Sequence, residues 1–134
     1  MQITISEPQI LVLGSINMDL VVRGDQLPGA GETVIGGEFF QVSGGKGANQ
    51  AVAAAGMGAL VRMVGRVGDD MFGPGILDGL RERGVDVRGV ATDPDHATGV
   101  AVILLDAARQ NHIVAVYGAN MECNGDQIQA VESA

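Results

Sequence analysis

Residues 44–58 join a glycine-rich turn to an alanine-rich stretch, and this segment restricts the fold of the chain more than any other. The run GGKGANQAVAAAGMG begins with paired glycines, which permit tight turns, and continues with alanines, which favour helix. Gly56 or Gly58 supplies a signal for the helix to end. The pattern predicts a helix near residues 47–57 that is entered through a sharp turn.

Short apolar runs alternate with helical patterns around this segment. Residues 10–13 and 60–67 are predicted to be buried strands, and the polar run SINMD after Gly14 is predicted to be a loop. A second helix is expected to start after GDD and to end at Gly84, before a third strand in VDVRGV. This order predicts an α/β layer with a mainly parallel sheet.

Two further regions are typical of small antiparallel strands. Residues 20–43 contain short alternating segments broken by PGAG and GG, and residues 97–117 contain two apolar runs separated by AARQN, which predict a hairpin. A last helix is expected with Asp126 as its N-cap. Because the chain stops where that helix should continue, we expect a truncated or incomplete product with an uncovered apolar edge.

Charge and cysteine content limit the partners and the compartment. The chain carries 16 acidic residues against 8 basic ones, for a net charge of −8, so nucleic acid and anionic membrane surfaces are not expected partners. Cys123 is the single cysteine, which excludes an internal disulfide. The start MQITISEPQ lacks the features of a signal peptide, and no apolar run reaches membrane-spanning length. We expect a cytoplasmic protein.

The glycine-rich run carries a family resemblance. GGKGANQA, followed by Gly58 and Gly68, resembles the first signature of the ribokinase (PfkB-type) family of carbohydrate kinases. The upstream GSINMD and the downstream VGRVGDDMFG are similar to that family at the same places. The resemblance covers almost all of residues 1–134 and implies the amino-terminal part of a ribokinase-like α/β domain. That domain has a Rossmann-like, mainly parallel sheet with flanking helices and a small antiparallel β lid.

The resemblance also implies which residues bind the sugar, taken to be ribose or a similar small sugar. The matching positions are Asn17, Asp19, Gly44, Gly45, Lys46 and Asn49. The chemistry agrees, because each sugar hydroxyl needs a donor or an acceptor once water is excluded. Asp19 can accept two hydroxyls, Asn17 and Asn49 each offer a donor and an acceptor, and Lys46 adds a charged donor. Gly44 and Gly45 would let the backbone approach the sugar.

The lid implied by the resemblance comprises strands around 20–43 and 97–117. Ala101 and Ala115 match the lid positions whose apolar side chains face the sugar, and family members commonly have a bulkier residue at the position of Ala115. Lid closure would exclude water from phosphoryl transfer. In this family the lid often clasps a second subunit, so we expect a homodimer through the lid strands of the complete protein.

The resemblance further implies ATP and Mg²⁺, and it leaves open a monovalent cation. The family's catalytic Asp lies in a Gly-Ala-Gly-Asp turn, and its metal-associated motif is Asn-x-x-Glu, neither of which occurs in these 134 residues. We therefore expect no catalytic residue, no ATP site and no metal site in this chain, which should be inactive alone. Asp69 and Asp70 are interpreted as partners of a helix dipole, and His96 and His112 as histidines without a metal.

Two alternatives remain at this point. The chain could be a non-catalytic sugar-binding or lid-mediated interaction module, or an unfolded remnant of a disrupted gene. The substrate also remains open between ribose and a close relative such as deoxyribose, because these sugars differ by a single hydroxyl.

Overall fold

The structure, a computed structural model, describes residues 9–132. Its elements follow the order β1 (Gln9–Leu13), β2 (Asn17–Arg23), β3 (Glu38–Gly44), α1 (Lys46–Gly56), β4 (Leu60–Gly68), α2 (Gly73–Glu82), β5 (Val85–Asp93), β6 (Gly99–Leu105), β7 (Asn111–Val116), the 3₁₀ helix η1 (Gly118–Glu122) and α3 (Gly125–Glu132). The expectation that the start of the chain is not a signal peptide falls almost entirely on residues 1–8, which lie outside the described residues.

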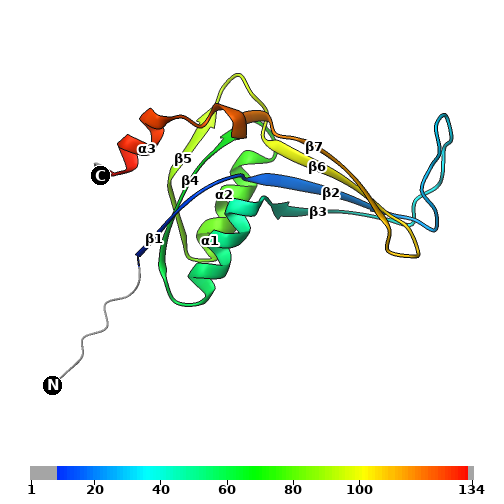
Figure 1. Ribbon diagram of the computed structural model, residues 1–134, viewed down its shortest axis with the longest axis horizontal. Coiled ribbons are helices and arrows are strands. Elements are labelled where there is room, and N and C mark those ends of the chain that lie inside the picture. The colour runs from blue at the N-terminus through cyan, green and yellow to red at the C-terminus, as the bar shows by residue number, and fades with distance from the viewer. Residues whose placement is uncertain (1–8, 133–134) are drawn as a thin grey trace.

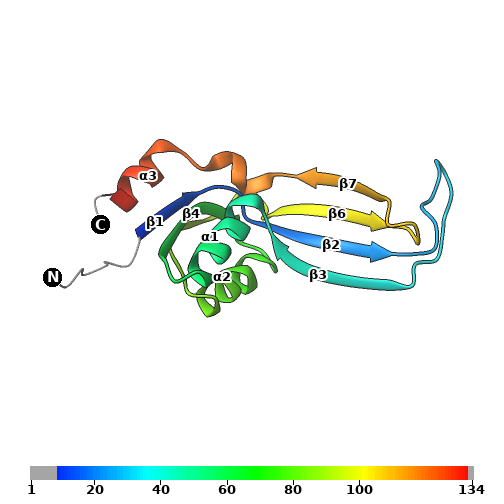
Figure 2. The ribbon, with the colours of Figure 1, turned by 60° about the horizontal axis from the view of Figure 1, so that its bottom comes forward.

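The strands form two sheets that lie end to end (Figure 1). The central sheet has the order β1-β4-β5 and is parallel throughout. Helices α1 and α2 cover one of its faces, and α3 lies on the other (Figure 2). Strand β4 is in the middle of this sheet, and its side chains Met63, Val64 and Val67 are completely buried. The buried helix residue Ile76 belongs to the same core, so this layer contains the main hydrophobic core.

The outer sheet has the order β3-β2-β6-β7 and extends away from the helices (Figures 1 and 2). Strands β3 and β7 are antiparallel to their neighbours, whereas β2 and β6 run parallel. The parallel pair differs from the purely antiparallel lid expected from the sequence. It arises because β2 follows β1 and β6 follows β5, so both strands leave the central sheet in the same direction.

The regular elements agree with most of the expectations from local pattern. Helix α1 and the three strands of the central sheet are confirmed, and the predicted hairpin corresponds to β6 and β7. Two predictions are wrong. Asn17, Met18 and Asp19 open β2 instead of a loop, because Met18 is buried against the core while its two polar neighbours alternate to the other face. The side chain of Asn124, not Asp126, accepts the backbone N–H of Gln127 at the start of α3.

Candidate functional site

One row of side chains crosses the outer sheet near its junction with the central sheet. The pairing register places Asp19 beside Val42 on β3 and beside Ala101 on β6, and Ala101 pairs with Ala115 on β7. Residues paired directly across strands point to the same face of a sheet. These four residues, which we call the Asp19 row, therefore present one carboxylate among small and apolar neighbours. Asn17, two residues before Asp19, lies on the same face.

Asp19 is half-buried, and its carboxylate makes no hydrogen bond or ion pair with any other residue between 9 and 132. Burial raises the pKa of its carboxyl group, because removing a carboxylate from water disfavours the charged form. A buried carboxylate without a partner is costly to keep. Its two oxygens are thus available as acceptors for a ligand.

The glycines at the end of β3 are required by the protein's own packing. A Cβ at Gly44 would overlap the carboxylate of Asp19, and a Cβ at Gly45 would overlap the backbone of Ser15. Gly45 also has a φ of 99°, which disfavours any residue with a side chain. The close approaches seen at these two positions are therefore to Asp19 and Ser15. Whether the same backbone also approaches a sugar, as the sequence predicts, stays a prediction.

Gly45 is followed directly by helix α1, whose first residue is Lys46. The backbone N–H of Lys46 donates to Oγ of Ser15 at 3.1 Å, which joins the start of the helix to the β1–β2 connection. Its ammonium group is exposed and has no carboxylate partner among the described residues. Lys46 is a free cation close in sequence to the backbone that contacts Asp19.

Asn49 is also exposed, but it lies differently from the other predicted site residues. It borders a hollow between β3, α1 and α2, together with Gln41, Ser43 and Arg83. Ser43 pairs with Met18, so it belongs to the face of the outer sheet opposite Asp19. In the described part of the chain, no hydrogen bond links the side chains of Lys46 or Asn49 to Asn17 or Asp19. The structure thus brings together Asn17, Asp19, Gly44, Ala101 and Ala115, and leaves the roles of Lys46 and Asn49 as predictions.

Asn120 is a site neighbour that sequence reasoning missed. Its Nδ2 donates to Oδ1 of Asn17 at 2.8 Å, across 103 positions of the chain. The only sequence signal is the run YGAN after β7, where Gly118 has a φ of 52° and starts η1. Spacing along the chain does not connect this run to Asn17.

Asp70 is structural, as the sequence predicts. Its Oδ1 accepts the N–H groups of Phe72 and Gly73 at the start of α2, and its Oδ2 accepts the N–H of Thr98 at 2.7 Å. Burial would raise the pKa of this carboxyl group, but the hydrogen bonds from Thr98, Gly73 and Phe72 outweigh that effect and lower it. Asp70 therefore joins α2 to the segment that enters β6.

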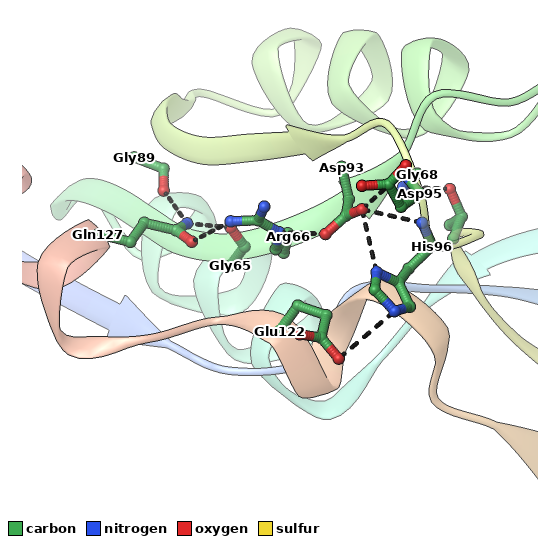
Figure 3. Close-up of polar contacts among 10 residues, drawn as sticks. Gly65, Arg66, Gly68, Gly89, Asp93, Asp95, His96, Glu122 and Gln127 are labelled. Atoms are coloured by element: carbon green, nitrogen blue, oxygen red, sulfur yellow. Dashed lines mark hydrogen bonds and ion pairs between the residues drawn. The ribbon is translucent and has the colours of Figure 1, made fainter.

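A second polar cluster lies at the end of β5 (Figure 3). Asp93 is buried, with 4% of its side chain exposed, and its Oδ2 accepts Nε of Arg66 at 2.6 Å. Its Oδ1 accepts the backbone N–H groups of Asp95 and His96, both at 2.8 Å, and lies 3.1 Å from Nδ1 of His96. The Arg66 guanidinium and these backbone donors hold the pKa of Asp93 well below its usual range.

The same cluster extends to η1 and α3. Nε2 of His96 lies 3.6 Å from Glu122, and Gln127 accepts from Arg66 while donating to the carbonyl oxygens of Gly65 and Gly89. The polar groups of this cluster are hydrogen-bonded to one another, so few of them remain available to a ligand. Residues 9–132 contain no group of three or more His, Cys, Asp or Glu side chains that could hold a metal ion.

None of the helices in the described part of the chain combines the length and the apolar character needed to cross a membrane.

Comparisons with known proteins show the family of the chain. Residues 7–134 match the model of the pfkB family carbohydrate kinases. The chain is 53% identical over 111 residues to the ribokinase of Bacillus subtilis, and this match covers 83% of the chain and 38% of the relative. It is 40% identical over 111 residues to the deoxyribokinase of Salmonella typhi, covering 83% of this chain and 36% of the relative.

A solved structure of Arabidopsis thaliana ribokinase, complexed with ribose and ATP, superposes with a TM-score of 0.82 at 34% identity. The match covers 97% of this chain and 44% of that one. This structural match confirms the fold class expected from the sequence. The chain spans less than half of the length of the relatives that it matches.

Proposed function

Because the chain belongs to the pfkB family of carbohydrate kinases, we propose that it forms the sugar-binding part and the lid of a kinase for ribose or a close relative. The reaction would transfer the γ-phosphoryl group of ATP to a hydroxyl of the sugar, giving ribose 5-phosphate from ribose. We place the protein in the cytoplasm. The names of the relatives, ribokinase and deoxyribokinase, support this class of substrate.

One observation carries the proposal, namely the half-buried, unpartnered carboxylate of Asp19 among the small side chains of its row. Sugar hydroxyls would donate to Asp19, and the NH₂ group of Asn17 would donate to a sugar oxygen on the same face. Ala101 and Ala115 leave space and exclude water above the carbon skeleton. These groups bind and orient the sugar, and the outer sheet acts as the lid that keeps water from the reacting hydroxyl.

We assign ATP, Mg²⁺ and the catalytic base to the part of these kinases that this chain does not match. Residues 9–132 contain no cluster of three or more His, Cys, Asp or Glu side chains, and we attribute no step of the transfer to them. Together, ATP and Mg²⁺ supply the phosphoryl group and neutralise its developing charge. We expect this chain alone to give no sustained ADP release from ATP and ribose, and a coupled assay with the purified chain measures this directly.

Calorimetric titration with ribose tests the sugar site. The unaltered chain should bind ribose, and Asp19→Asn should weaken binding roughly 10- to 100-fold, because a hydrogen bond to a charged group contributes about 1.5–3 kcal/mol. Asp25→Asn is the matched control, because Asp25 is exposed in the loop after β2 and its carboxylate has no partner among residues 9–132. Parallel titration with 2-deoxyribose compares the two sugars. Equal ribose affinities for the unaltered chain and Asp19→Asn would contradict the assignment.

A specific observation favours a second role, in which the outer sheet pairs with a second copy of the chain. Strands β3 and β7 expose large apolar side chains, including Phe39 (60% exposed), Val114 (66%) and Val116 (56%). Exposed apolar groups of this size are typical of interaction surfaces. Light scattering after size exclusion should report a dimer that Val114→Glu converts to a monomer, whereas a monomer at every concentration would contradict this role.

A further inference from the structure

The side chain of Asn120 can adopt only one orientation, because backbone groups determine it. Its Oδ1 accepts the N–H of Ile16 at 2.9 Å, and its Nδ2 donates to the carbonyl oxygens of Ile16 at 3.1 Å and Tyr117 at 2.9 Å. A flipped amide would place an oxygen against two carbonyl oxygens and an NH₂ group against an N–H. The identity of the two amide atoms of Asn120 therefore follows from the backbone around it.

This orientation determines that of Asn17. The Nδ2 of Asn120 also faces Asn17 at 2.8 Å, so its two hydrogens are shared among three acceptors. Because an amide nitrogen cannot accept a hydrogen bond, the group of Asn17 that points toward it must be the acceptor Oδ1. The Nδ2 of Asn17 has no hydrogen-bond partner among residues 9–132. Asn17 is thereby presented as a donor on the face that carries Asp19.

The backbone around this contact is closely packed. Gly99 lies directly opposite Asn17 on β6, and a Cβ there would overlap both Nδ2 of Asn120 and Oδ1 of Asn17. The backbone of η1 is also fixed, because the N–H of Ala119 donates to the carbonyl of Ala97 at 2.7 Å and Ala119 is completely buried. The Asn120–Asn17 contact therefore lies between closely packed backbone segments.

We propose that Asn120 is a positioning residue that fixes the Asn17 amide as a hydrogen-bond donor to the sugar. The inference rests on the proposed function for its ligand, but the orientation of Asn17 is a separate property of the folded chain. On one face, Asp19 then offers only acceptors and Asn17 offers only a donor. A sugar hydroxyl between them can donate to Asp19 and accept from Asn17, so the group facing Asn17 must have an acceptor oxygen.

Calorimetry on a double-mutant cycle tests whether Asn120 acts through Asn17. Asn120→Ala should weaken ribose binding about 3- to 10-fold, the loss expected for one hydrogen bond, and should have no further effect in the Asn17→Ala chain. Asn111→Ala is the control, since Asn111 is exposed at the start of β7. Equal losses in both backgrounds would show that Asn120 acts on the fold in general and would overturn the proposal.

Asn17→Asp provides a second variant that leaves Asn120 intact. The carboxylate of Asp can still accept from Asn120, so the fold should be retained, but the donor toward the sugar is lost. We expect ribose affinity to fall at least as far as in Asn17→Ala. Wild-type affinity in Asn17→Asp would overturn the donor orientation.

Hydrogen exchange of side-chain amides, followed by ¹⁵N NMR, separates this inference from the proposed function. The NH₂ protons of Asn120 should exchange at least tenfold more slowly than those of the exposed Asn111, and this protection should persist in Asn17→Asp. Exchange as fast as in Asn111 overturns the proposal whether or not ribose binds. If the unaltered chain does not bind ribose, the proposed function fails, and slow exchange at Asn120 still supports its hold on Asn17.

Discussion

Asp19 and Asp93 are two acidic residues whose surroundings give them opposite properties. Asp93 is buried and accepts hydrogen bonds from Arg66, Asp95 and His96, which hold its pKa well below the usual range (Figure 3). Asp19 is half-buried, has no partner among the described residues, and has a raised pKa. The carboxylate of Asp93 has its hydrogen-bond partners within the protein, whereas that of Asp19 carries a desolvation cost that a ligand could relieve.

The comparison separates polar groups that hold the fold from polar groups that await a ligand. A satisfied network stabilises the folded state and binds nothing else. An unsatisfied carboxylate lowers stability and is retained where function requires it. Disrupting the Asp93 cluster should therefore lower stability, whereas substituting Asp19 should lower sugar affinity without lowering stability.

The largest expected effect is on the Asp93 cluster. Arg66→Met removes the ion-pair partner of a buried carboxylate, so the melting temperature should fall by on the order of 10 °C, as measured by circular dichroism. Glu38→Gln is the control, because the Arg23–Glu38 pair at 2.8 Å is more than half exposed and should contribute less than about 1 kcal/mol. Similar losses in both variants would contradict the structural role of the Asp93 cluster.

The pH dependence of stability should have opposite signs at the two carboxylates. The lowered pKa of Asp93 gives a stabilisation that is present above the unfolded value of 3.8 and is lost as pH falls below it. The raised pKa of Asp19 gives a cost above its folded pKa that is relieved as pH falls toward 3.8. Thermal melts between pH 3 and pH 7 should show Asp93→Asn approaching the unaltered chain only below about pH 4, and Asp19→Asn approaching it as pH falls to about 4.

The central sheet and the Asp19 row also differ in how far they could be predicted from sequence. Helix α1 and the central strands follow from local patterns, namely the alanine-rich run and the short apolar segments. The position of Asp19 beside Ala101 requires the register of β2 against β6, which pairs segments about 80 residues apart and leaves no local signal. Asp19 and Ala101 were instead identified as candidate site residues from the family resemblance.

Neither local sequence patterns nor the family resemblance predicted the contacts of Asn120 or the Asp93 cluster. Asn120 meets Asn17 across 103 residues, and Gln127 meets Gly65 across 62. Such contacts depend on where η1 and α3 pack after the sheets have formed. The polar residues after Gly14 predict a loop at Asn17 and Asp19, although the apolar residues Met18, Leu20 and Val22 recur at every second position, as in a strand.

A smaller effect is expected for stability at Asp19. Asp19→Asn replaces an unpartnered carboxylate by a neutral amide of similar size, so the melting temperature at pH 7 should stay constant or rise by about 2 °C while ribose affinity falls. Differential scanning calorimetry on the chain without sugar measures this. A fall of several degrees would show that Asp19 holds the fold, which would remove the contrast with Asp93.

The smallest effect concerns the exposed end of the Asp93 cluster. Nε2 of His96 lies 3.6 Å from Glu122, with both side chains nearly half exposed, and the pair is charged only when the imidazole is protonated. Glu122→Gln should therefore cost less than about 0.5 kcal/mol. Asn120→Ala should cost more, because Asn120 and the buried Ala119 hold η1 through backbone contacts. If chemical denaturation shows a larger loss in the free energy of unfolding for Glu122→Gln than for Asn120→Ala, the His96–Glu122 pair holds η1 in place. Asn120 would then be placed by η1 and would not position Asn17.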